Sequence, residues 1–94
     1  MLSGTVAGTY QSDTWTLHED GEDRKFMTIQ QFSTPFIRPP TVVVSISEVD
    51  APAGPLRVRV AAADITNTGF TVEITTWADS KLYGAVASWI AYES

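Results

Sequence analysis

Six short runs rich in Val, Ile, Thr and aromatic residues recur along the chain, and no long run shows helical spacing. Turn-forming residues separate several of them, such as Pro39-Pro40 before the third run and residues 66–69 before the fifth. We expect Asn67 and Gly69 to supply the positive φ that a tight hairpin turn needs. Short strands at this spacing are typical of an antiparallel β-sandwich or a small β-barrel. The predicted strands lie within or span residues 2–10, 25–32, 41–49, 56–65, 70–77 and 82–92.

Alternation within the later runs assigns side chains to two faces. In residues 56–65, Arg57 and Arg59 share the face opposite to Leu56, Val58, Val60 and Ala62. In residues 70–77, Phe70, Val72 and Ile74 point inward, so Thr71, Glu73, Thr75 and Trp77 point outward. The pattern therefore predicts a large aromatic side chain on an otherwise polar face.

The sixth run is apolar on both faces. One face carries Leu82, Val86, Ile90 and Tyr92, and the other carries Tyr83, Ala85, Ala87, Trp89 and Ala91. In a two-layer domain one of these faces meets the core, and the other is covered by a long loop or a neighbouring subunit. We favour a neighbouring subunit, because a chain of 94 residues without cysteine has no disulfide to stabilise a small core.

Length and charge limit the function classes. Residues 1–94 predict a single domain, and the polar, acidic segment 11–22 predicts a long loop. A net charge of −5 with scattered basic residues argues against nucleic-acid binding. No apolar run approaches the roughly 20 residues that cross a bilayer, so membrane insertion is not expected. Residues 1–11 lack the features of a signal peptide, so an expected role at an extracellular or particle surface leaves the export route open.

Catalysis has little support in the sequence. His18 is the one histidine and is interpreted as a solvated loop side chain. Carboxylates such as Asp23, Glu48 and Asp50 would suit a small glycoside hydrolase, but such enzymes usually need a deeper cleft than this chain can build. Residues 18–25 fit a solvated acidic loop, a calcium loop with atypical spacing, or a polar contact to a sugar. We expect no enzyme activity, no metal and no cofactor.

The outward Trp77 and the nearby Tyr83 suggest another chemistry. The C–H patches of a pyranose pack on aromatic faces, while its hydroxyls bond to arginine and carboxylate groups, and charged partners make the stronger hydrogen bonds. The same two aromatic residues would also suit a strand edge or a subunit interface, and chemistry alone leaves both interpretations open.

Several short motifs in the last two-thirds of the chain occur in a familiar order. They are Phe32-Ser33-Thr34-Pro35-Phe36, Arg38-Pro39-Pro40 with the run that follows, Leu56-Arg57-Val58, Thr68-Gly69-Phe70, Thr76-Trp77, Lys81, Tyr83 and Ser88-Trp89-Ile90. In these motifs the chain resembles the H-type lectin domain family, which includes a snail agglutinin for N-acetylgalactosamine and the discoidin C-terminal domains. The first 30 residues match poorly.

The resemblance implies a six-stranded antiparallel β-sandwich that assembles as a trimer, or as a hexamer of two trimers, with sugars bound between subunits. Arg57 falls on a family arginine that bonds sugar hydroxyls, and Trp77 and Tyr83 fall on its aromatic contacts. Gly21 and Asp23 match its glycine and aspartate if a gap of about two residues is allowed. Two departures are Ala78, where the snail lectin has a histidine, and the absence of cysteine.

These features predict a non-catalytic, oligomeric lectin for galactose- or N-acetylgalactosamine-type glycans, with Gly21, Asp23, Arg57, Trp77 and Tyr83 as the sugar contacts. The alternative is a structural, assembly or receptor-binding module, such as a component of a phage particle, with a degenerate sugar site. Ala78 is the sequence feature that favours this alternative.

Overall fold

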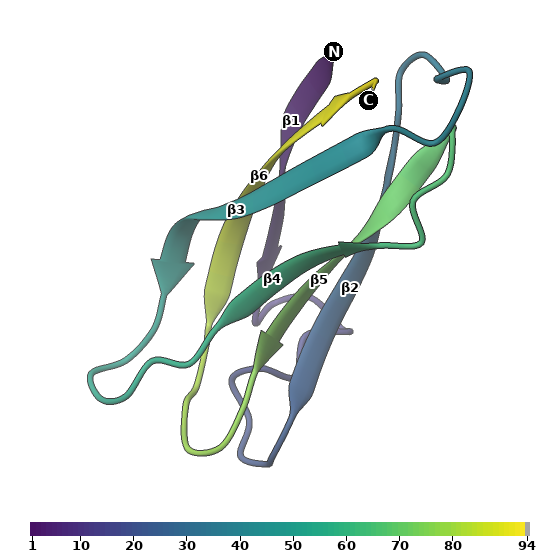
Figure 1. Ribbon diagram of the computed structural model, residues 1–94. Helices are drawn as coiled ribbons and strands as arrows, with labels where there is room; N and C mark the ends of the chain where they lie inside the picture. Colours follow the sequence, from purple (N-terminus) through teal and green to yellow (C-terminus); the bar gives the residue numbers. More distant parts are fainter. Residues whose placement is uncertain (94) are drawn as a thin grey trace.

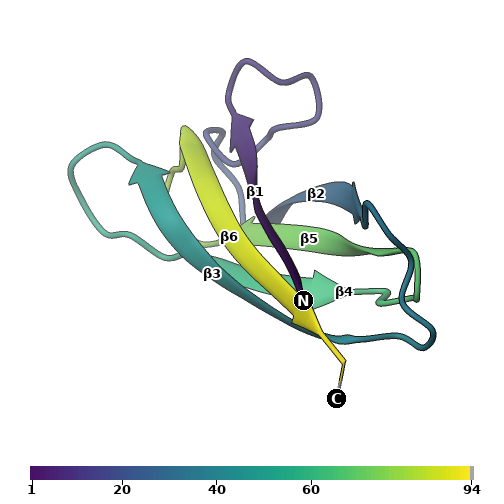
Figure 2. The ribbon, with the colours of Figure 1, turned by 90° about the horizontal axis from the view of Figure 1, so that it is seen from above.

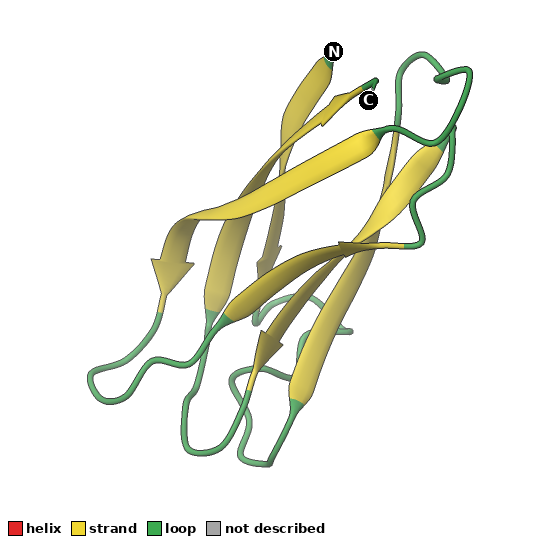
Figure 3. Cartoon of the chain, in the orientation of Figure 1, coloured by secondary structure: helices red, strands yellow, loops and turns green. Residues whose placement is uncertain are grey.

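The computed structural model describes residues 1–93, which form six antiparallel β-strands in two three-stranded sheets (Figure 1 and Figure 3). Sheet A has the strand order β1-β6-β3, and sheet B has the order β2-β5-β4. The all-β prediction with six antiparallel strands is therefore confirmed. The strands are β1 (Leu2–Thr9), β2 (Arg24–Gln31), β3 (Thr41–Asp50), β4 (Arg59–Ala63), β5 (Gly69–Thr76) and β6 (Gly84–Tyr92). None of the described residues belongs to a helix that could cross a membrane.

The two sheets lie face to face as separate layers, and the core fills the space between them (Figure 2). The central strands supply most of it: Phe70, Val72 and Ile74 of β5, which the alternation predicts to point inward, and Ala85, Ala87, Trp89 and Ala91 of β6 are all buried. The rings of Phe70 and Trp89 meet edge to face with their centroids 5.3 Å apart. Small alanines on β6 thus leave room for the large aromatics opposite them.

The loop between β1 and β2 contributes to this core, which the sequence analysis did not predict for segment 11–22. Trp15 is 2% exposed and Leu17 is fully buried. The Trp15 indole N–H donates to the Leu82 carbonyl at 2.8 Å, and the Leu82 N–H donates to the Leu17 carbonyl at 2.8 Å. Leu82 is therefore buried in the segment before β6, instead of beginning the strand as predicted. Gly8 makes this packing possible, because a Cβ there would lie 2.8 Å from the Trp15 ring and 2.7 Å from the Phe26 ring.

The fourth strand is shorter than predicted and begins at Arg59. Before it, the Arg57 backbone bonds to side chains of the turn after β5: its N–H donates to the Ser80 hydroxyl at 3.0 Å, and its carbonyl accepts from the Thr76 hydroxyl at 2.5 Å. The segment before Arg59 therefore lies outside the strand: Leu56 is exposed, while Val58 and Val60, which the alternation places on the same face as Leu56, pack against the core.

The turn at residues 66–69 forms without positive φ at Asn67 or Gly69, so that expectation is wrong. The left-handed residue of this connection is Asp64, at φ 51°. The Thr66 hydroxyl accepts from the N–H groups of Thr68 and Gly69, both at 3.2 Å. Position 69 requires glycine because the neighbouring strand lies close to its backbone: a Cβ there would lie 2.6 Å from the Gln30 carbonyl oxygen.

Each sheet also exposes apolar side chains on its outer face. On sheet A, Val43 and Ile90 are register partners, and together with Tyr92 they form an exposed group that we name patch A. On sheet B, Met27 and Ile29 of β2 are exposed and form patch B. The apolar second face predicted for the sixth strand is therefore present at Ile90 and Tyr92.

Candidate functional site

The five predicted contact residues lie in loops at one end of the sandwich, where the β1–β2, β3–β4 and β5–β6 connections meet (Figure 1). Gly21 and Asp23 precede β2, Arg57 precedes β4, and Tyr83 precedes β6. Trp77 follows β5, which ends at Thr76, so it begins the turn instead of ending the strand as predicted. The two chain termini marked in Figure 1 lie at the other end.

Arg57 is attached to the turn that carries Trp77 by its side chain as well as its backbone. Its guanidinium forms an ion pair with the Asp79 carboxylate. Together with the Ser80 and Thr76 hydroxyls, this pair binds one arginine at three points of the same turn. The structure therefore brings Arg57 and the segment of Trp77 together, as the resemblance implies for a shared site.

The Trp77 ring is partly buried beneath a second arginine. The guanidinium carbon of Arg59 lies 5.2 Å from the ring centroid, within the range of a cation–π contact. Arg59 faces away from the core, opposite to Val58 and Val60, so Trp77 lies on the outer side of sheet B. The alternation placed Arg59 on this face, but the sequence carried no signal that it would cover the ring.

Arg24 connects the loop of Gly21 and Asp23 to the same turn, and the sequence analysis did not identify it. Arg24 is 8% exposed, and its hydrogen-bond partners within residues 1–93 are all backbone carbonyls. Its Nε donates to Glu22 at 2.9 Å, its Nη2 donates to Ala78 at 2.9 Å, and its Nη1 reaches Leu17 and Glu19. Gly21 lies against the same side chain, where an added Cβ would be 3.7 Å from the Arg24 Cδ. One residue thus fixes both loops relative to each other.

Tyr83 lies in a different group from Trp77. Its ring packs edge to face against Tyr10 at 5.8 Å and beside His18 at 6.0 Å. Its N–H donates to the Asp50 carbonyl at 2.8 Å, and its carbonyl accepts from the Tyr10 N–H at 2.8 Å. His18 is therefore a packed side chain and not the solvated one expected, and its Nδ1 is buried without a hydrogen-bond partner among residues 1–93.

Several groups of the acidic segment 18–25 contact other parts of the protein. Arg24 bonds the carbonyls of Glu19 and Glu22, and the Asp20 carboxylate lies 3.3 Å from the Lys81 ammonium. Across the described residues, no three His, Asp or Glu side chains come close enough to hold a metal ion. Asp23 remains exposed at the loop end.

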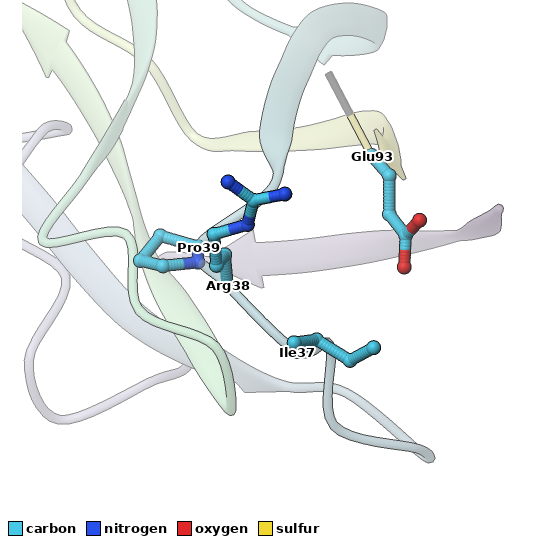
Figure 4. A pocket seen from close by; sticks show the side chains of 4 residues that line it. All are labelled: Ile37, Arg38, Pro39 and Glu93. Atoms are coloured by element: carbon cyan, nitrogen blue, oxygen red, sulfur yellow. The ribbon is translucent and has the colours of Figure 1, made fainter.

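A hollow of about 160 Å³ lies at the opposite end of the molecule, beside the chain terminus. It is lined by Ile37, Arg38 and Pro39 of the β2–β3 loop and by Glu93 after β6 (Figure 4). It contains none of the five predicted residues. The loop end with Arg57 and Trp77 is therefore a separate surface.

Solved structures of discoidin II share this fold. The native structure of recombinant discoidin II of Dictyostelium discoideum aligns with a TM-score of 0.79 and 22% identity over 97% of this chain and 37% of that chain. Wild-type discoidin II from the same organism aligns with a TM-score of 0.77 and 22% identity over 96% of this chain and 36% of that one. The chain thus spans little more than a third of discoidin II. A structural similarity at 22% sequence identity shows that the fold is shared. No curated protein matches the sequence.

The sequence model of the H-type lectin domain matches residues 28–92, which is more than half of the chain and includes Arg57, Trp77 and Tyr83. It begins after Gly21 and Asp23, in agreement with the weak resemblance of the first 30 residues. The chain belongs to the H-type lectin domain family.

Proposed function

We propose that this chain is a non-catalytic lectin that binds terminal galactose- or N-acetylgalactosamine-type residues at the loop end. The observation that carries the proposal is the attachment of Arg57 to the turn of Trp77 within an H-type lectin domain. This arrangement joins an arginine to the turn that carries an aromatic residue, and these are the two kinds of group that a pyranose ring and its hydroxyls require.

In this proposal each residue has a distinct role. The sugar C–H groups pack on the part of the Trp77 ring that Arg59 does not cover. The Arg57 guanidinium donates to hydroxyls with the N–H groups that Asp79 leaves available. The exposed Asp23 carboxylate accepts from hydroxyls, the Gly21 backbone approaches closely, and Tyr83 forms a second aromatic contact.

We further propose that the chain assembles as a trimer, or as a hexamer of two trimers, with sugars bound between subunits. A ring of three identical subunits uses two different surfaces of each chain. Patch A and patch B lie on opposite sheets and supply two apolar surfaces of this kind. Since one sugar site binds at about millimolar strength, or roughly −4 kcal/mol, useful avidity would come from several sites presented together.

The substitution Trp77→Ala tests the proposal. Isothermal titration with galactose and with N-acetylgalactosamine is expected to show weak binding to the unaltered protein and none to the variant. Ile37→Ala is the control, because Ile37 is an exposed apolar residue at the opposite end. Equal binding by a folded Trp77→Ala protein would rule out the proposed site.

A structural or assembly role with a degenerate sugar site remains the second candidate. Ala78 supplies no imidazole beside Trp77, and Arg59 covers part of the ring. An intact oligomer that binds no sugar in the same titrations would favour this role, for example as an assembly or receptor-binding component of a larger particle.

A further inference from the structure

Arg59 is the first residue of β4 and is exposed beside the proposed sugar site. Its guanidinium carbon lies 5.2 Å from the centroid of the Trp77 ring. This contact restricts a long side chain to one region of the surface, next to the ring that we propose as the sugar platform. A group fixed in this way loses less conformational entropy when it binds a ligand.

The basic residues near Arg59 form ion pairs with carboxylates, whereas Arg59 itself forms none within residues 1–93. Lys25 and Arg59 flank Thr75 in register on either side of β5. The Lys25 ammonium lies 3.4 Å from the Glu73 carboxylate, and Arg57 is paired with Asp79. Among residues 1–93, no carboxylate pairs with Arg59 and no hydrogen bond of its guanidinium is present.

The missing carboxylate partner of Arg59 does not result from a shortage of acidic residues. The chain carries eleven acidic and six basic residues, yet the carboxylates near the turn pair with Lys25 and Arg57. The attraction to the Trp77 ring acts between a cation and π electrons, so it uses none of the guanidinium hydrogen-bond donors. These donors form a planar fork that matches a carboxylate or sulfate group.

The overall charge of −5 does not prevent binding of a small anion at this place. At physiological ionic strength, exposed charges more than about 8 Å apart are largely screened from each other. Whether a small anion binds here then depends on the nearest charges, and Arg59 contributes one positive charge that its neighbours do not neutralise.

We propose that Arg59 makes the site prefer sugars that carry an anionic substituent, a carboxylate or a sulfate, over the neutral sugars of the same type. This inference rests on the proposed function, because it places the anionic group of the sugar beside the Trp77 platform. Arg59 is then a specificity-determining residue that contacts the substituent, while Arg57 contacts ring hydroxyls.

The test compares methyl galactoside with the methyl glycoside of galacturonic acid, which keeps its free carboxylate, and with methyl galactoside 6-sulfate by isothermal titration. We expect each anionic sugar to bind about fivefold more tightly than the neutral one, since hydrogen bonds between charged groups are stronger. Raising the salt concentration is expected to reduce this preference. Comparing the two anionic sugars shows whether the site favours the planar carboxylate or the sulfate.

Arg59→Gln is expected to bring the preference to about twofold or less, and Arg59→Lys to retain part of it, because lysine keeps the charge without the fork. Arg38→Gln is the matched control: it makes the same change in net charge at the opposite end, and the preference is expected to persist. An unaltered protein that binds neutral and anionic sugars equally, or an unchanged preference in Arg59→Gln, would overturn the inference and leave the lectin proposal intact. A folded protein that binds neither neutral nor anionic sugars would overturn both this inference and the lectin proposal.

Discussion

Arg24 brings a positive charge into the protein with backbone carbonyls around it. Four carbonyls, from Leu17, Glu19, Glu22 and Ala78, receive its N–H groups. Lysine has a single nitrogen and cannot reach carbonyls on both loops with the geometry of a guanidinium fork. Arg24 therefore determines how the β1–β2 loop meets the β5–β6 turn.

Replacing Arg24 with Met is expected to lower the free energy of unfolding by about 2–4 kcal/mol, because the buried Leu17 carbonyl and three partly buried bonds to carbonyls lose their donor. Arg24→Lys is expected to lose roughly half as much. Urea unfolding followed by circular dichroism measures both changes. A Met variant within about 0.5 kcal/mol of the unaltered protein would show that these bonds contribute little.

Ala78 has a left-handed backbone, with φ 58°, which is uncommon for a residue with a Cβ. Ala78→Gly is expected to stabilise the protein by roughly 0.5–1 kcal/mol, because relief of this strain outweighs the greater freedom of glycine in the unfolded chain. Ala53→Gly, in a loop and without positive φ, is the control and is expected to destabilise. Thermal unfolding compares the two, and an equal loss in both variants would contradict the account.

Single residues show where prediction from the sequence reached its limit. Arg57, Trp77 and Tyr83 were predicted from motifs, and the structure places all three at one end. Arg24 was missed because its burial depends on carbonyls from segments far apart in sequence. The one available sign was its spacing, since Arg24 and Phe26 share the core-facing side of β2. Arg59 over Trp77 likewise follows from pairing between β4 and β5.

At the level of elements, periodicity predicted the strands well and the connections poorly. The alternation of β5 gave the correct core face, because a strand buried on one side repeats every two residues. For β6 the alternation separated two apolar faces and left open which of them meets the core. The loop of residues 10–23 has no such period, so the burial of Trp15 and Leu17 could not be derived from it. The early start predicted for β4 failed because the Arg57 backbone bonds to Ser80 and Thr76.

Trp15→Ala tests whether the β1–β2 loop is part of the core. The indole fills space beside Phe26, with ring centroids 5.0 Å apart, and its removal leaves a cavity. We expect a loss of about 3–5 kcal/mol in the free energy of unfolding. Thr16→Ala, an exposed neighbour in the same loop, is expected to stay within about 0.5 kcal/mol. A small effect at Trp15 would mean that the loop is only attached to the surface.

For the whole molecule, the two exposed apolar patches determine what the chain can assemble into. Ile90→Arg places a charge at the centre of patch A and is expected to dissociate the proposed trimer, because an unpaired charge is costly to bury. Light scattering should change from three or six times the 10.2 kDa of one chain to a single chain. Ile37→Arg introduces the same charge at an exposed position of the β2–β3 loop, outside patch A and patch B, and is expected to leave the assembly unchanged. A monomeric unaltered protein would contradict the assembly proposal.

The sequence predicted only part of the surfaces that the proposed assembly and glycan binding use. Patch A followed from the apolar second face of the sixth strand, but patch B was not predicted, because Met27 and Ile29 occur in a run with polar neighbours. Family membership rests on residues 28–92 and leaves the loop of Gly21 and Asp23 outside the match. In our proposals the choice of sugar depends on that loop and on Arg59.

The most direct test is a glycan array probed with the labelled protein and with Trp77→Ala beside it. The account predicts binding to galactose- or N-acetylgalactosamine-terminated glycans that is lost in the variant, while circular dichroism shows both proteins folded. A blank array from a well-folded oligomer, or equal signals from the two proteins, would contradict a sugar site at Trp77.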